Sequence, residues 1–243
     1  MFRSKAVKIM TVILAVIALG LSVFAFFFTH GLTDIRTNPA YKDGQIKVAC
    51  VGDSVTYGYN LGRKSSYPAL LSGMMGESYH VCNFGISGST VQDSGDQPYT
   101  KTKAYRESLD YEADILVFML GSNDTKPENW QGEEKFTEAY NKLLDSYLQK
   151  DKKPTVYLCT VATAFFPDGI TEGLTSYDVQ PSYVEAVADI IRDIAKERSL
   201  PVIEINNLTE NSFALLIQES FDHPFLLGGV PLIFYIQKQI YSI

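Results

Sequence analysis

The chain has 243 residues, 46% of them hydrophobic, which suffices for one α/β domain of ordinary size with a short appendage. Its formal net charge of -7 and its pI near 5.0, with no run of Lys or Arg after the first residues, argue against the basic face that a nucleic-acid partner requires. We therefore expect no nucleic-acid partner. An uncharged or locally neutral substrate fits this composition better.

The first predicted element is an apolar helix over Ile9–Phe28. This stretch carries no charge, and as a helix it would be roughly 30 Å long, which matches the hydrocarbon core of a bilayer. Arg3, Lys5 and Lys8 precede it, so the positive-inside rule predicts a cytoplasmic N-terminus and an extracytoplasmic remainder. Residues 1–30 are thus predicted to be a cytoplasmic stub and a single-pass anchor in the cell membrane.

A cleaved signal peptide is the alternative interpretation of the same stretch. Its apolar region would be shorter, usually about 7–15 residues, and would end at a small-x-small site. Val23-Phe24-Ala25 is a marginal site of this kind, and cleavage there would leave three phenylalanines at the mature N-terminus. In that case the domain would be secreted. The polar residues 31–45 that follow predict a tether, and residues 46–243 a single domain.

Five short apolar runs alternate with helical patterns after the tether. Residues that are apolar in succession are typical of parallel strands covered on both faces by helices, so each run predicts a strand. The runs are Lys47–Val51, His80–Asn83, Ile115–Leu120, Thr155–Thr160 and Val202–Ile205. Apolar residues recur at helical spacing in Glu133–Gln149 and from about Ser182 to Arg198. The predicted fold is a three-layer α/β/α sandwich around a parallel sheet.

The cysteines of the chain lie within these apolar runs. Cys50, Cys82 and Cys159 are neither spaced as Cys-x-x-Cys nor clustered with histidine, so we expect small core residues rather than metal ligands. No metal or cofactor is expected.

Candidate catalytic residues follow the first three strands, where ligands of parallel α/β sheets bind. After the first strand comes Gly52-Asp53-Ser54, whose serine is either a nucleophile with its own N–H facing an oxyanion or an ordinary helix N-cap. The second loop, Asn83–Thr90, and the third, Gly121–Asp124, are rich in small residues and hydrogen-bond donors. Turn formation alone would also account for their composition.

A base for Ser54 must come from the histidines, of which the chain has three. His30 abuts the predicted anchor, and His80 begins the second predicted strand, where packing or capping is its expected role. His223 is the remaining candidate.

These residues together resemble a known family. Gly52-Asp53-Ser54, Gly88, Gly121-x-Asn123-Asp124 and His223-Pro224 are similar in order and spacing to the four blocks of SGNH (GDSL-type) hydrolases, over roughly residues 46–240. The resemblance implies a flavodoxin-like fold, Ser54 as nucleophile and His223 as general base. It also implies an oxyanion hole formed by the N–H groups of Ser54 and Gly88 and the side chain of Asn123. Asn83–Gly88 and Leu120–Trp130 further resemble carbohydrate or sialate O-acetylesterases.

The sequence departs from the family pattern next to the histidine. The catalytic acid of the family stands three residues earlier, where this chain has Ser220, and Asp222 is directly adjacent instead. Adjacent side chains of an extended segment point to opposite sides, and Pro224 favours extended geometry at His223. We therefore expect Asp222 to orient His223 poorly, so that Ser54 and His223 act as a dyad. Pro231 is unusual within the last predicted helix.

Two further features have alternative interpretations. Asp53 and Asp124 would suit a carboxylate-pair mechanism, but both flank turns and are expected to brace backbone N–H groups instead. Trp130 either stacks on a sugar or packs its own loop.

The function indicated is hydrolysis of short acyl esters, acetyl above all, on a small molecule or a glycan. A lysophospholipase or short-chain lipase and an acyltransferase would use the same residues. An inactive glycan-binding relic is the non-enzymatic alternative, because of the altered segment around His223.

Overall fold

The computed structural model describes residues 17–22, 38–59, 66–164 and 178–211. The chain forms two units, Met1–Ile35 and Arg36–Ile243. Of the first unit only residues 17–22 are described, and they are helical. Most of the predicted span Ile9–Phe28 therefore lies outside the described residues. Within the described part of the chain, no helix combines the length and the apolarity needed to cross a membrane.

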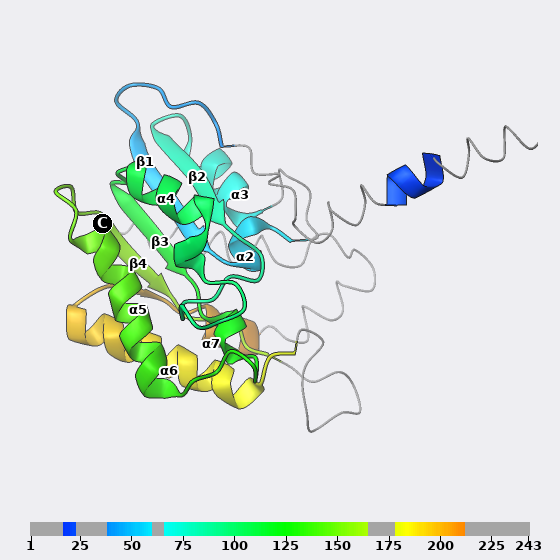
Figure 1. The fold of residues 1–243 in the computed structure, drawn as a ribbon. Coiled ribbons are helices and arrows are strands. Elements are labelled where there is room, and N and C mark those ends of the chain that lie inside the picture. Colours follow the sequence, from blue (N-terminus) through cyan, green and yellow to red (C-terminus); the bar gives the residue numbers. More distant parts are fainter. Residues whose placement is uncertain (1–16, 23–37, 60–65, 165–177, 212–243) are drawn as a thin grey trace, which may run out of the picture. The chain divides into compact units, whose positions relative to one another are not determined.

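Within the described residues, the second unit is built on a parallel sheet of five strands (Figure 1). They are β1 (Ile46–Gly52), β2 (Tyr79–Gly85), β3 (Ile115–Met119), β4 (Thr155–Cys159) and β5 (Val202–Ile203), in the order β2-β1-β3-β4-β5. All five predicted strands are confirmed. The last is shorter than predicted, because Ile205 begins a helix instead of continuing the strand.

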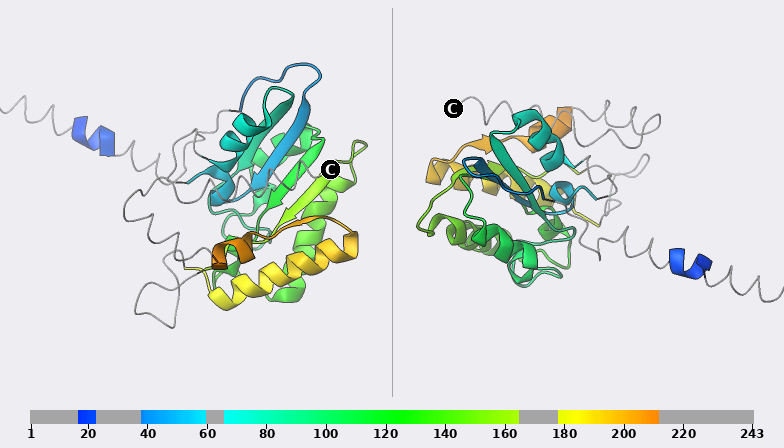
Figure 2. Two further views of the ribbon diagram at one scale, coloured as in Figure 1. Left: turned by 180° about the vertical axis from the view of Figure 1, so that it is seen from behind. Right: turned by 90° about the horizontal axis from the view of Figure 1, so that it is seen from above.

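Helices cover both faces of this sheet (Figures 1 and 2). The described helices are α2 (Ser54–Tyr57), α3 (Tyr67–Met75), α4 (Lys103–Asp110), α5 (Glu133–Leu148), α6 (Pro181–Arg198) and α7 (Ile205–Asn211). Ala49 and Val51 of β1 pack with residues of α4, α5 and α6, whereas Val48 and Cys50 pack with α3 and Ile205. Alternate residues of one strand thus enter two cores. This is why the strands are apolar on successive residues, and it confirms the predicted α/β class with its parallel sheet.

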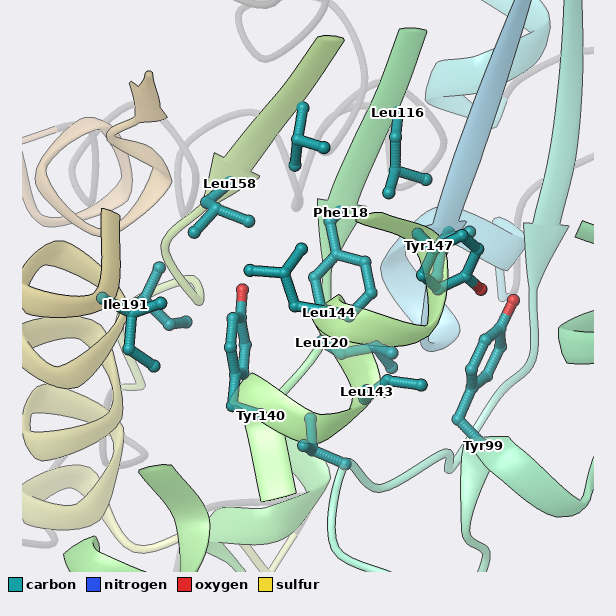
Figure 3. Packing of buried hydrophobic residues seen from close by; sticks show 14 of the residues in the cluster. Tyr99, Leu116, Phe118, Leu120, Tyr140, Leu143, Leu144, Tyr147, Leu158 and Ile191 are labelled. Carbon is teal, nitrogen blue, oxygen red and sulfur yellow. The ribbon is translucent and has the colours of Figure 1, made fainter. Parts of the chain in front are cut away.

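The larger core lies between the sheet and helices α5 and α6 (Figure 3). The ring of Tyr140 meets that of Phe118 edge-on, with 5.3 Å between the centroids. Tyr140 and Leu144 of α5 fill the space between Phe118 of β3 and Ile191 of α6. The helical spacing in the sequence therefore marks the faces that are buried here. The three cysteines are free thiols in these cores, as predicted.

Part of the predicted tether runs along the outer edge of β2. The side chain of Asn38 accepts from the N–H of Asn83 at 2.7 Å and donates to its carbonyl oxygen at 3.3 Å. Nε2 of His80 lies 2.8 Å from the carbonyl oxygen of Pro39, and Gln45 donates to the carbonyl oxygen of Glu77 at 2.7 Å. Residues 38–45 are thus held against the domain. His80 packs at this edge, which agrees with the role expected for it.

Candidate active site

The three candidate loops leave the sheet side by side. Gly52, the last residue of β1, is in register with Gly85 of β2 on one side and with Met119 of β3 on the other. Because the strands are parallel, Ser54, Gly88 and Asn123 follow these partners at the same carboxyl edge. The central position of β1 in this trio places Ser54 in the middle loop.

Ser54 is the first residue of α2, and Asp53 is the N-cap. The carboxylate of Asp53 accepts from the N–H of Val55 at 3.0 Å, which frees Ser54 from a capping role. The interpretation of Ser54 as an ordinary N-cap is therefore wrong. Its side chain is partly exposed, and none of the described residues accepts from its N–H, as expected in the first turn of a helix.

A close backbone approach at Gly52 makes this turn possible. A Cβ there would lie 1.9 Å from Oγ1 of Thr56 and 2.6 Å from the carbonyl oxygen of Met119. Only glycine fits between β3 and the first turn of α2. The Gly52 carbonyl oxygen also accepts from the N–H of Ile86 at 3.0 Å, which joins the first loop to the second.

The second loop presents the N–H of Gly88. Gly88 has φ of +81°, a left-handed conformation that suits glycine, and the N–H of Ser89 closes the turn on the Ile86 carbonyl oxygen at 3.3 Å. None of the described residues accepts from the Gly88 N–H. Farther along the loop, the buried Tyr99 donates to the Phe84 carbonyl oxygen at 2.7 Å and ties the loop to β2.

The third loop forms a short 3₁₀ helix, η2 (Ser122–Thr125), and is bonded to the second. Nδ2 of Asn123 donates to the carbonyl oxygen of Ser89 at 3.1 Å. An amide nitrogen has two hydrogens, so one remains for a ligand. The partly exposed Asn123 therefore keeps one N–H donor that a ligand could use.

Two buried carboxylates lie beneath these loops. Burial raises the pKa of Asp53 to about 6, and the hydrogen bond from Val55 offsets only part of this effect. Burial likewise raises the pKa of Asp124 to about 7, and the negative charge of Asp53 contributes in the same direction. Asp124 accepts from the N–H groups of Val91 and Gln92 at 2.8 and 2.9 Å. The prediction that both carboxylates brace backbone N–H groups is confirmed.

The remaining candidates divide into two groups. His223 and Asp222 lie outside the described residues, as do Ser220 and Pro231. Trp130 is described, and its ring stacks on that of Tyr183 with centroids 4.9 Å apart and planes 15° apart. It also packs against the core of α5 and α6, which favours loop packing over sugar stacking.

Asn129 is a site residue to which sequence reasoning gave no role. It is buried, and its Nδ2 donates to the carbonyl oxygen of Asn123 and to the carboxylate of Asp96, both at 2.9 Å. The signal was its place in the Asn123–Trp130 segment, since a buried asparagine needs several partners. No group of three or more His, Cys, Asp or Glu in the described segments is arranged to hold a metal.

Ser54 begins helix α2 directly beyond the carboxyl end of β1, the second strand in the spatial order of the sheet, where ligands of parallel α/β sheets bind. The chain belongs to the GDSL-like lipase/acylhydrolase family, a family of carboxylic ester hydrolases, whose model matches residues 50–225.

Particular relatives are similar to different extents. An acetylxylan esterase of Xylanibacter ruminicola is 30% identical over 210 residues, which are 78% of this chain and 42% of that protein. The chain thus spans less than half the length of this curated relative.

Solved structures share the fold at lower identity. Est24, a carbohydrate acetylesterase from Sinorhizobium meliloti, superposes with a TM-score of 0.53 at 16% identity, over 66% of this chain and 84% of that one. The native aryl esterase of M. smegmatis gives a TM-score of 0.60 at 14% identity, over 81% and 99%. At these identities the likeness shows the fold.

Proposed function

We propose that this protein is a serine esterase that removes short acyl groups, acetyl above all, from a carbohydrate through an acyl-enzyme on Ser54. The observation that carries the proposal is the meeting of Ser54, Gly88 and Asn123 at one edge of the sheet. There the backbone N–H groups of Ser54 and Gly88 and the second hydrogen of Asn123 Nδ2 have no acceptor among the described residues.

The proposed reaction begins when His223 takes the proton of Ser54 as Oγ attacks the ester carbonyl carbon. The carbonyl oxygen becomes an oxyanion, and the donors of Ser54, Gly88 and Asn123 stabilise it. The tetrahedral intermediate then collapses: the bond to the alcohol oxygen breaks, and His223 returns the proton to the departing alcohol. Water attacks the acyl-enzyme with His223 again as base, and the short acid leaves.

The substrate class rests on the relatives rather than on the geometry. Two of them are named for acetyl esters of carbohydrates, and the narrower sequence resemblance points to the same chemistry. A small acyl group leaves the alcohol part of the substrate to supply most of the binding contacts. We therefore propose an acetylated sugar as substrate and an acetate ion as product.

Chain-length preference tests the acyl part. Rates with p-nitrophenyl esters from acetate to octanoate should be highest for acetate, and acetylated xylan should release acetate. A maximum rate with octanoate would indicate a lipase or lysophospholipase instead. Transfer of the acyl group to an added sugar in preference to water would indicate an acyltransferase. Absence of hydrolysis together with retained binding of xylan would indicate the inactive glycan-binding protein.

Two variants test the residues. Ser54→Ala should abolish hydrolysis while the thermal unfolding midpoint stays close to that of the wild type. Asn123→Ala should lower kcat by ~10²–10³, the loss typical of one oxyanion donor. Asp93→Asn is the matched control, because Asp93 is an exposed residue paired with Lys142 and should leave kcat unchanged. Near-wild-type turnover of Ser54→Ala would refute the nucleophile.

A further inference from the structure

The Asn123 donor is supported by side chains that themselves lie beneath the substrate edge. Asp124 directly follows it in η2 and is fully buried. Its Oδ2 accepts from the N–H of Val91 at 2.8 Å and its Oδ1 from the N–H of Gln92 at 2.9 Å. Each carboxylate oxygen is thus used on one backbone amide of the loop that also carries Gly88.

Asn129 completes this support from the other side. Its Nδ2 donates to the Asn123 carbonyl oxygen at 2.9 Å, and its Oδ1 accepts from the N–H of Asp96 at 2.9 Å. The carbonyl oxygen of Asn129 accepts from Nε2 of the buried Gln92 at 3.1 Å. Asn129 therefore bonds both to the residue that carries the donor and to the loop that Asp124 holds.

These bonds fix the two oxyanion loops relative to each other. The Asn123 amide is directed by the Ser89 carbonyl oxygen, and Ser89 lies between Gly88 and the amides that Asp124 holds. A shift of the loop would move the acceptor that orients Asn123. Because an oxyanion-hole donor acts only if it lies about 2.7–3.1 Å from the developing charge, a small displacement removes most of its effect.

We propose that Asp124 and Asn129 are positioning residues for the oxyanion hole, which hold the Asn123 amide and the Gly88 loop in their working arrangement. The inference rests on the proposed function. It assigns to Asp124 a role outside proton transfer: its carboxylate accepts two backbone N–H groups and acts on the reaction through Asn123.

Isosteric variants separate positioning from general stability. Asp124→Asn keeps one acceptor oxygen but places an NH₂ group against the other backbone N–H. Asn129→Asp keeps an acceptor for the Asp96 N–H but loses the donor to the Asn123 carbonyl oxygen. For each variant, kcat and KM for p-nitrophenyl acetate are measured on protein shown to be folded by circular dichroism, with Asp93→Asn as the control from the same loop.

Positioning predicts that kcat falls by roughly 10–100-fold in either variant, less than the loss of the donor itself, while KM stays within about threefold. It also predicts non-additivity: in an Asn123→Ala background, Asp124→Asn should cost several-fold less than in the wild type, because the donor it positions is already gone.

Unchanged kcat in folded Asp124→Asn and Asn129→Asp would overturn the inference. So would a fold-loss of kcat from Asp124→Asn that is as large in the Asn123→Ala background as in the wild type. If Asp124→Asn does not fold, Asn129→Asp is judged by the same criteria. Wild-type protein without any ester hydrolysis would overturn the proposed function and this inference together. Activity that requires Ser54 but is indifferent to both variants would overturn the inference alone.

Discussion

Replacing Asp53 by asparagine should change how the stability of the domain depends on pH. Asp53 is 1% exposed, and its pKa is raised from the ordinary 3.8 to about 6, chiefly by burial. A carboxyl group whose pKa is higher in the folded state than in the unfolded state contributes to the stability of the fold at pH values below its unfolded-state pKa. That contribution is lost as the pH rises through the folded-state pKa. For Asp53 the loss therefore falls between pH 3.8 and about pH 6.

The magnitude follows from the rise in pKa. Two pKa units correspond to about 3 kcal/mol at 1.36 kcal/mol per unit, of which on the order of 2 kcal/mol falls between pH 4 and pH 7. Asparagine keeps the oxygen that accepts from Val55 and carries no charge, so the cap remains. Asp53→Asn should therefore reduce the loss of unfolding free energy between pH 4 and pH 7 by this amount. The pKa of Asp124 should also fall, because the charge of Asp53 contributes to raising it.

The assay is urea unfolding at intervals from pH 4 to pH 7. The single tryptophan, Trp130, stacks on Tyr183, so its fluorescence reports loss of the packed domain. Asp93→Asn is the control. The pKa of Asp93 is lowered, first by the hydrogen bond from Thr100, so the contribution of Asp93 to stability is lost only below its ordinary pKa of 3.8, outside the pH range of the assay. Equal pH dependence of the unfolding free energy in Asp53→Asn and the wild type would refute the reasoning.

Three more predictions concern the turn before Ser54, the altered histidine segment and the N-terminus. Gly52→Ala should lower the unfolding free energy by ~1–3 kcal/mol, since its Cβ would lie 1.9 Å from Oγ1 of Thr56. Gly73→Ala should not lower it, because a Cβ at Gly73 has nothing within 4 Å, and equal effects of the two variants on urea unfolding would contradict the steric argument. Asp222→Asn should lower kcat less than tenfold, far short of the ~10⁴ lost with an acid that fixes the tautomer, and a thousandfold loss in folded protein would reveal a true triad. The full chain should fractionate with membranes and resist carbonate extraction through Ile9–Phe28, whereas a soluble form beginning near Phe26 would indicate a cleaved signal.

The sheet could be predicted from the sequence because burial on both faces leaves a simple pattern. Val48 to Val51 are all fully buried, and an unbroken apolar run of this length is typical of a strand covered on both faces. Helices α3 and α4 were not predicted. In α4, which has eight residues, only Ala104, Tyr105 and Leu109 provide apolar contacts with the core, too few for a helical period to stand out, and α2 is too short for any periodicity to be seen.

The site could be predicted only as far as residue types and turn geometry allow. A glycine before Ser54 and polar loops after the strands indicated where chemistry should lie, and Asp124 was correctly expected to hold backbone amides. The part played by Asn129 could not be predicted, because it depends on which carbonyl oxygens a buried amide meets in three dimensions. The same limit applies to Trp130, whose stacking partner, Tyr183, lies far along the chain.

The central claim, that Ser54 is an activated nucleophile, is tested most directly by a fluorophosphonate probe. The full-length protein is incubated with the probe, digested and mapped by mass spectrometry, beside Ser54→Ala and Asp93→Asn. Labelling of the wild type and Asp93→Asn on Ser54 alone, with none in Ser54→Ala, is the predicted result. An unlabelled wild type, or a label on another residue that persists in Ser54→Ala, would contradict the account.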